Sequence, residues 1–207
     1  MNKKVIGIIG RADVLMFDLD GVLVATNYAN FLSYLKAIQQ LIQSDIDLTY
    51  ESNKRFTRET LKRVIPTISK NKFEEIIELK NKFYIEYLNE TKLNYSVVKI
   101  LNEYSNTKKM VLVTNSHKER AIVTLEYHGV MDKFNHRFYR QDTQCSNKYE
   151  YALSFLQIPP ASMVIFENEN SEIDSAILAG IPENNIISIE FITLKNNNYV
   201  HIYNFPQ

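Results

Sequence analysis

Four short apolar runs, each followed by a turn and then a helical pattern, constrain the fold of this chain more than any other feature. The runs cover residues 14–17, 110–113, 163–166 and 186–189. Runs of this length are typical of parallel strands that are buried on both faces. Polar residues stand directly after the first three runs. Because open α/β sheets bind their ligands at the carboxyl ends of the strands, these polar residues mark a candidate site.

The predicted helices between these strands have clear stop signals. The pattern over 117–128 ends at Gly129, and the pattern over 171–179 ends at Gly180, with glycine suited to the position just after a helix. The helix predicted over 148–157 ends before Pro159 and Pro160. This alternation of strands and helices predicts an α/β fold with a parallel sheet. The segment over 199–203 is interpreted as an edge strand.

Residues 24–95 contain no strand–turn–helix cycle. Apolar residues instead follow helical spacing in two stretches, 31–42 and 73–88, with Pro66 between them. We therefore expect a helical cap domain over 24–95, inserted into a core domain made of residues 1–23 and 96–207. The alternative is a single domain in which these helices cover one face of the sheet.

The charge balance excludes some classes of function. The 207 residues include 24 Lys and Arg and 24 Asp and Glu, so the formal net charge is zero. A broad nucleic-acid surface needs a basic surplus, so no nucleic-acid partner is expected. The apolar run near the N-terminus is too short for a signal peptide, and no stretch is long enough to cross a membrane. With Cys145 as its one cysteine, the chain is expected to be cytoplasmic. The sequence does not indicate an oligomeric state.

The pair Asp18 and Asp20 is the first candidate for chemistry. Gly21 ends the strand, so both carboxylates are expected in a loop at the strand end. Two carboxylates that lie close together repel each other unless a proton or a cation intervenes. Magnesium takes hard oxygen ligands and would relieve this repulsion. One carboxylate can then attack phosphorus while the other moves a proton. The alternative is an ordinary polar turn.

Three further positions have both a chemical and a structural interpretation. The segment Thr114-Asn115-Ser116 suits a phosphate through its hydroxyls and the N–H groups of the next helix, or it is only a helix cap. Lys148 is either a cation beside the phosphoryl group or a solvated surface residue. Glu167 with Asn168 offers oxygen ligands to a cation, or begins a helix whose dipole favours acidic residues.

The four positions together resemble the haloacid dehalogenase-like hydrolase superfamily, in the β-phosphoglucomutase-like subgroup. The resemblance covers about residues 12–190. The matching motifs are Phe17-Asp18-Leu19-Asp20-Gly21-Val22-Leu23, Val113-Thr114-Asn115-Ser116, Lys148, and Phe166-Glu167-Asn168 with Ala176, Ala179 and Gly180 after it. The resemblance implies a Rossmann-like three-layer α/β core with a parallel sheet, plus an inserted all-helical cap.

The resemblance also implies a role for each matching residue in catalysis. Asp18 would be the nucleophile that becomes phosphorylated. Asp20 would protonate the leaving group and later deprotonate the attacking water. Thr114 and the backbone of Asn115 would bind phosphoryl oxygens, and Lys148 would offset their charge.

A magnesium ion is implied in the same way. Its ligands would be Asp18, the Asp20 carbonyl, Glu167 and Asn168. The family usually has aspartate where this chain has Asn168, so one negative charge is lost. We therefore expect weaker magnesium binding, or a substitute ligand in Glu169.

Other positions also depart from the family pattern. Glu172 stands where the family has glycine, and Tyr149 replaces the proline usual after the lysine. In the cap, Ala25 replaces an acidic residue, and Asn30 corresponds to the histidine used by the mutase. Arg58 matches a cap arginine that grips a second phosphate.

These observations predict a magnesium-dependent phosphatase that acts on a small phosphorylated metabolite. A sugar-phosphate mutase is the alternative enzyme, and Asn30 counts against it. A protein that binds a phosphorylated ligand or another protein without turnover is the alternative from another class. Asn168 and Glu172 are the two departures that favour this third interpretation.

Overall fold

The computed structural model describes residues 3–42, 48–52, 54–143, 147–193 and 199–204, so Cys145 lies outside the described residues. The chain divides into two compact units. The first contains Met1–Val24 and Leu93–Gln207, and the second contains Ala25–Lys92. Each unit has a hydrophobic core of its own, as separately folded parts of a chain require.

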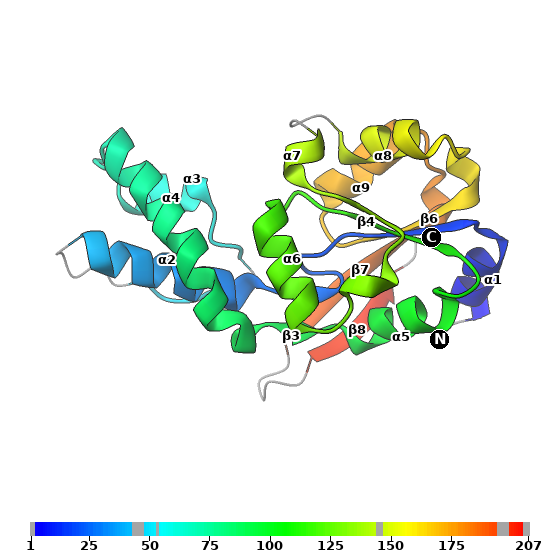
Figure 1. The fold of residues 1–207 in the computed structure, drawn as a ribbon, viewed down its shortest axis with the longest axis horizontal. Coiled ribbons are helices and arrows are strands. Elements are labelled where there is room, and N and C mark those ends of the chain that lie inside the picture. The colour runs from blue at the N-terminus through cyan, green and yellow to red at the C-terminus, as the bar shows by residue number, and fades with distance from the viewer. Residues whose placement is uncertain (1–2, 43–47, 53, 144–146, 194–198, 205–207) are drawn as a thin grey trace. The chain divides into compact units, whose positions relative to one another are not determined.

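A six-stranded sheet forms the centre of the first unit (Figure 1). Its first five strands are parallel, and the last pairs antiparallel with its neighbour at the edge. In spatial order the strands are β5 (His136–Phe138), β4 (Lys109–Val113), β1 (Val14–Phe17), β6 (Met163–Glu167), β7 (Ile186–Thr193) and β8 (Tyr199–Asn204).

Helices cover both faces of this sheet, which gives three layers. Along β1, Leu15 and Phe17 belong to the core on one face, and Val14 and Met16 belong to the core on the other. This alternation is the two-residue period of a strand, so an apolar run buries both of its faces. The first face packs against α1 (Lys3–Arg11), α5 (Tyr95–Tyr104) and α6 (Lys118–Tyr127), and the second against α8 (Lys148–Leu156) and α9 (Asn170–Leu178).

Short helices complete the connections of the first unit. They are α7 (Arg140–Thr143) and the 3₁₀ turns Met131–Lys133, Pro160–Ser162 and Glu183–Asn185. Gly129 and Gly180 follow α6 and α9 with φ of 66° and 92°. This left-handed conformation carries no steric penalty at glycine, which explains why both helices stop where the sequence predicted.

The second unit is helical. It contains α2 (Asn27–Leu41), α3 (Arg58–Val64), α4 (Lys70–Tyr84) and a 3₁₀ segment over Ile85–Glu90. The side chains of Thr57 and Ser69 cap α3 and α4 by accepting backbone N–H groups, so both helices begin at a polar residue. The short strands β2 (Val24–Ala25) and β3 (Lys92–Leu93) pair with each other where the chain enters and leaves this unit.

The predicted α/β fold with a parallel sheet is confirmed. All four predicted strands are present, and the edge strand predicted over 199–203 is β8. Between residues 27 and 91, the described part of the chain contains helices and no strand. Helices α1, α5 and α7, strand β5 and the short pair β2 and β3 have no counterpart among the elements predicted from the sequence. Among the described residues, no helix is both long enough and apolar enough to cross a membrane.

Candidate active site

The loop after β1 holds Asp18 and Asp20 at the carboxyl end of the central strands. The Asp18 N–H donates to the Phe166 carbonyl at 3.1 Å, and the Leu19 carbonyl accepts the N–H groups of the three residues from 22 to 24. Gly21 makes this turn possible with φ of 85°. Both carboxylates are buried, with 7% of Asp18 and 6% of Asp20 exposed. The expected loop at the strand end is therefore present.

Lys148 lies between two of the predicted acidic residues. Its Nζ is 3.0 Å from Asp18 Oδ1 and 2.9 Å from Glu167 Oε2. The lysine is the first residue of α8, where the Asn147 side chain caps the helix by accepting two backbone N–H groups. Only 3% of Lys148 is exposed, so it is not a solvated surface residue. A buried ammonium needs such carboxylate partners, and they fix its position.

Glu167 is fully buried and accepts four hydrogen bonds. Its Oε2 accepts from Lys148 and from the Tyr149 hydroxyl at 2.5 Å. Its Oε1 accepts the backbone N–H groups of Asn168 at 2.8 Å and of Glu169 at 3.2 Å. A carboxylate offers about four lone-pair positions, so these donors already engage its capacity. Glu167 therefore acts first as an anchor that orients Lys148 and the loop after β6.

Asp20 has different partners. Its Oδ2 accepts from the Ser116 hydroxyl and pairs with Arg120, which also donates to Ser116. Ser116 follows β4, and Arg120 lies in the first turn of α6. The two carboxylates of the loop thus have different cationic partners, Lys148 for Asp18 and Arg120 for Asp20. These cations offset part of the mutual repulsion of the carboxylates.

Thr114 and Asn115 lie at the end of β4, beside the end of β1 in the sheet. The Thr114 side chain is buried, and its hydroxyl accepts the Ser116 N–H at 3.2 Å. Asn115 is exposed, and its Nδ2 donates to Glu172 Oε1 at 3.0 Å. The structure therefore brings the predicted phosphate-binding segment to the same edge of the sheet as Asp18.

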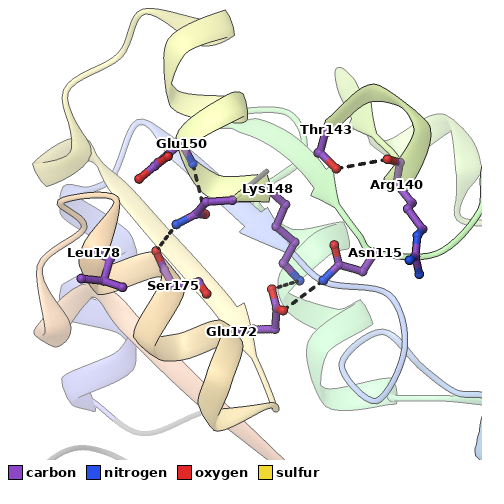
Figure 2. A pocket seen from close by; sticks show the side chains of 9 residues that line it. Asn115, Arg140, Thr143, Lys148, Glu150, Glu172, Ser175 and Leu178 are labelled. Atoms are coloured by element: carbon purple, nitrogen blue, oxygen red, sulfur yellow. Dashed lines mark hydrogen bonds and ion pairs between the residues drawn. The ribbon is translucent and has the colours of Figure 1, made fainter. Parts of the chain in front are cut away.

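Glu172 reaches into the site from the first turn of α9. Its Oε2 lies 3.3 Å from Lys148 Nζ, so one carboxylate contacts both this lysine and Asn115 (Figure 2). A cavity of about 590 Å³ adjoins this contact. The residues that line it are Asn115, Arg140, Thr143, Asn147, Lys148, Glu150, Glu172, Ser175 and Leu178.

Comparison with known proteins assigns the family. A family model described as haloacid dehalogenase-like hydrolase matches residues 15–185. The chain belongs to the haloacid dehalogenase-like hydrolase family. No curated protein matches the chain.

Solved structures of haloacid dehalogenase-like proteins share this fold. A variant of CbbY from Rhodobacter sphaeroides, in complex with xylulose-1,5-bisphosphate, has a TM-score of 0.72 with 14% identity and 90% coverage of each chain. A predicted phosphoglycolate phosphatase from Haemophilus somnus has a TM-score of 0.70 with 18% identity, covering 82% of this chain and 83% of its own. A β-phosphoglucomutase from Clostridium difficile has a TM-score of 0.64 with 20% identity and 82% coverage of each chain.

The site of this haloacid dehalogenase-like hydrolase carries a surplus of negative charge. Among its described residues, four carboxylates pair with two cations: Asp18, Asp20, Glu167 and Glu172 with Lys148 and Arg120. Burial raises the pKa of the Asp18 carboxyl from 3.8 to about 7, and the nearby Lys148 offsets only part of that rise. Burial lowers the pKa of Lys148, but its acidic neighbours raise it well above its ordinary value. The site therefore attracts either a proton or a further cation.

Asn168 provides a test of whether a cation fits. Its side-chain amide lies against the Asp20 carbonyl oxygen and Glu167 Oε1. With its nitrogen turned toward them, the amide donates to both, at 3.0 and 3.2 Å. With its oxygen turned toward them, three oxygens face one another, an arrangement that a hard cation would satisfy.

The residues present therefore fit magnesium, although the set is unusual. Among the described residues, no three His, Cys, Asp or Glu side chains gather as a ready metal site. The three oxygens that face one another come instead from the Asp20 carbonyl, the Asn168 amide and the single carboxylate of Glu167. The surplus of acidic charge supplies the attraction that the amide lacks.

Two residues of the site, Arg120 and Tyr149, were not predicted from the sequence. A third residue, Arg58, was predicted to bind phosphate but belongs to the second unit. Arg120 stands four residues after Ser116, and this helical spacing was the only sequence signal for its contact with that serine. Tyr149 was noted only as a departure from the family pattern. Its buried hydroxyl donates to Glu167, and burial raises its pKa well above the ordinary value. Arg58 is an exposed residue of the second unit, so its predicted phosphate contact stays a prediction.

Proposed function

We propose that this protein is a cytoplasmic, magnesium-dependent phosphatase that hydrolyses a small phosphorylated metabolite through an aspartyl-phosphate on Asp18. One observation carries the proposal: the buried Asp18 carboxylate lies at the carboxyl end of β1, 3.0 Å from the buried Lys148 ammonium. Burial removes competing water from the nucleophile, and the lysine supplies charge where the phosphoryl group would arrive. The family membership and the phosphatase among the structural neighbours support the same reaction class.

In the first half of the proposed reaction, an Asp18 oxygen attacks phosphorus and the bond to the leaving oxygen breaks. Asp20 gives its proton to that oxygen, so the product leaves as an alcohol. Thr114 and the backbone N–H of Asn115 bind the phosphoryl oxygens. Lys148 offsets the negative charge that three phosphoryl oxygens and Asp18 bring together.

In the second half, Asp20 takes a proton from water, and the water oxygen attacks the phosphorus on Asp18. The phosphorus–carboxylate bond breaks, which returns Asp18 and releases inorganic phosphate. Ser116 and Arg120 position the Asp20 carboxylate, and this one group serves first as acid and then as base.

Magnesium would be held by Asp18, the Asp20 carbonyl, Glu167 and Asn168. When bound, it neutralises charge on the phosphoryl oxygens and on Asp18. Glu167 was predicted as a direct ligand. Its Oε1 faces the Asn168 amide, and its four hydrogen bonds hold the carboxylate in that position.

The second unit supplies an argument for hydrolysis over transfer between sugars. Asn30 stands where the mutase has histidine. Asn30 is buried, and its Nδ2 donates to the Phe56 carbonyl at 2.9 Å within the same unit. This amide therefore holds two segments of the unit together. We propose that this unit is the substrate-selecting cap, and that Arg58 contacts a second anionic group of the substrate.

The test is hydrolysis of p-nitrophenyl phosphate with magnesium chloride and with EDTA. We expect turnover only with magnesium, and its loss in Asp18→Asn because an amide is a poor nucleophile. Asp13→Asn is the matched control, since this exposed aspartate precedes β1 and has no place in the proposed chemistry. Equal activity with EDTA, or an active Asp18→Asn protein, would end the proposal. Tight binding of phosphate without turnover would instead favour a binding protein.

A further inference from the structure

The Glu172 carboxylate contacts Lys148, which the proposed reaction places beside the phosphoryl group, and the side chain of Asn115, whose backbone N–H is proposed to bind that group. Its two oxygens lie 3.3 Å from Lys148 Nζ and 3.0 Å from Asn115 Nδ2. A phosphoryl oxygen is also an anionic acceptor and prefers the same kind of donor. The carboxylate thus stands where the proposed function brings a second anion.

Lys148 does not need Glu172 to balance its charge. Asp18 and Glu167 already lie 3.0 and 2.9 Å from the ammonium. A third carboxylate adds negative charge to a buried region that already has a surplus, which costs electrostatic energy unless it has another use.

Helix capping does not explain the orientation of Glu172 either. An acidic residue in the first turn of a helix is stabilised by the helix dipole even when it points into solvent. The Glu172 side chain is instead 20% exposed and turned toward Lys148. It forms part of the cavity wall, together with both of its partners (Figure 2).

The cavity gives this contact a consequence for ligands. An anion that enters the cavity to bind Lys148 or Asn115 finds both side chains already in contact with Glu172. It must displace the carboxylate and also overcome like-charge repulsion. A small anion with few other contacts has little interaction energy to offset these costs.

We propose that Glu172 is a specificity-determining residue whose carboxylate competes with the phosphoryl group for Lys148 and Asn115. This inference rests on the proposed function, which assigns the phosphoryl group to that position. Small anions such as inorganic phosphate then bind weakly and leave readily. Substrates that make further contacts away from the phosphoryl group displace Glu172.

The test is calorimetric binding of inorganic phosphate, with magnesium chloride present, to the wild type and to Glu172→Gln and Glu172→Ala. Glutamine keeps the size of the side chain and removes its charge, and alanine removes both. We expect phosphate to bind at least about tenfold more tightly to both variants, with the larger gain for alanine. Glu150→Gln is the matched control, because Glu150 lines the same cavity. Among the described residues, its side chain has no recorded contact with Lys148 Nζ or Asn115 Nδ2. Its affinity is expected to stay within about twofold of the wild type.

Phosphate affinity that is unchanged or weaker in both Glu172 variants would overturn the inference. So would the absence of measurable phosphate binding to every protein. The hydrolysis assay separates this result from the proposed function. If the wild type turns over substrate and the variants do not bind phosphate more tightly, the proposed phosphatase activity stands and the competing role of Glu172 is wrong. If the variants bind phosphate more tightly and no protein shows turnover, Glu172 competes with phosphate and the proposed phosphatase activity is wrong.

Discussion

Asn168 shows how one atom changes what a site prefers. An aspartate at this position would have no N–H group, so its oxygens would face the oxygens of the Asp20 carbonyl and Glu167. The amide can present nitrogen to both when no cation is bound, at 3.0 and 3.2 Å. Asparagine therefore stabilises the metal-free site by hydrogen bonding, and gives up a negative charge that would favour the metal-bound site.

We predict that Asn168→Asp binds magnesium about tenfold more tightly, a change of ~1.4 kcal/mol. The metal-free variant should also melt at a lower temperature, because its new carboxylate faces two oxygens without a donor. Titration calorimetry with magnesium chloride measures the first effect, and thermal unfolding in EDTA measures the second. Asn170→Asp adds the same charge at an exposed position two residues away; it should leave the magnesium affinity unchanged and should not lower the melting temperature, because an acidic residue in the first turn of α9 is favoured by the helix dipole. Equal magnesium affinities in the wild type and Asn168→Asp would show that Asn168 is not a ligand.

Individual residues differ in how well the sequence reveals them. Asp18, Asp20 and Glu167 follow buried strands directly, and the strand pattern alone placed them at one edge of the sheet. Arg120 and Tyr149 reach the site from helices, and their contacts depend on how α6 and α8 are rotated against the sheet. Periodicity shows which side of a helix is apolar, but it does not show which polar side chain at the rim turns inward.

The loop after β1 is the element in which sequence, backbone and site are most closely coupled. Gly21 has a positive φ of 85°, and a Cβ at this position would lie 2.5 Å from the Asn168 amide. Glycine is therefore required for two independent reasons: the backbone conformation and the close approach of the loop after β6.

We predict that Gly21→Ala lowers the free energy of unfolding by more than the ~1–2 kcal/mol expected for alanine with positive φ. We also predict that it weakens magnesium binding. Gly129→Ala is the matched control. Its φ is 66°, and a Cβ there has no neighbour within 4 Å. The control should lose only the free energy that positive φ costs alanine, which lowers the melting temperature by about 2–4 °C per kcal/mol. Its magnesium affinity should be unchanged. Equal losses in the two variants, with equal magnesium affinities, would refute the coupling between these loops.

Two of the elements that were not predicted, α1 and β5, lack a clear sequence signal for identifiable physical reasons. The buried residues of α1 include Val5, Ile8 and Ile9, at helical spacing, but Gly7 and Gly10 interrupt the pattern and both glycines disfavour a helix. Strand β5 has three residues, and His136 and Arg137 are only half-buried, so no continuous apolar run marks it. The runs that predicted β1, β4 and β6 are continuous because those residues are buried on both faces of the sheet.

For the whole molecule, the strand order explains why this site lies where it does. The chain passes from β1 to β4 and β5 on one side, and β6 and β7 lie on the other. Asp18 therefore follows the strand at which the order of the sheet reverses, with Thr114 and Glu167 at the ends of the two adjacent strands. Open α/β sheets bind ligands at such a point. The sequence indicated these strand ends, but only the observed order shows that they are neighbours.

The central claim is that Asp18 carries the phosphoryl group during turnover, and trapping that intermediate tests it most directly. The protein is mixed with radiolabelled acetyl phosphate and magnesium chloride, quenched in acid at increasing times, and digested for peptide mapping by mass spectrometry. We predict a transient label on the peptide that contains Asp18, released by hydroxylamine as an acyl phosphate should be, and absent from Asp18→Asn. Turnover of acetyl phosphate with no label on the protein at any quench time, or with the same label on Asp18→Asn, would contradict the account.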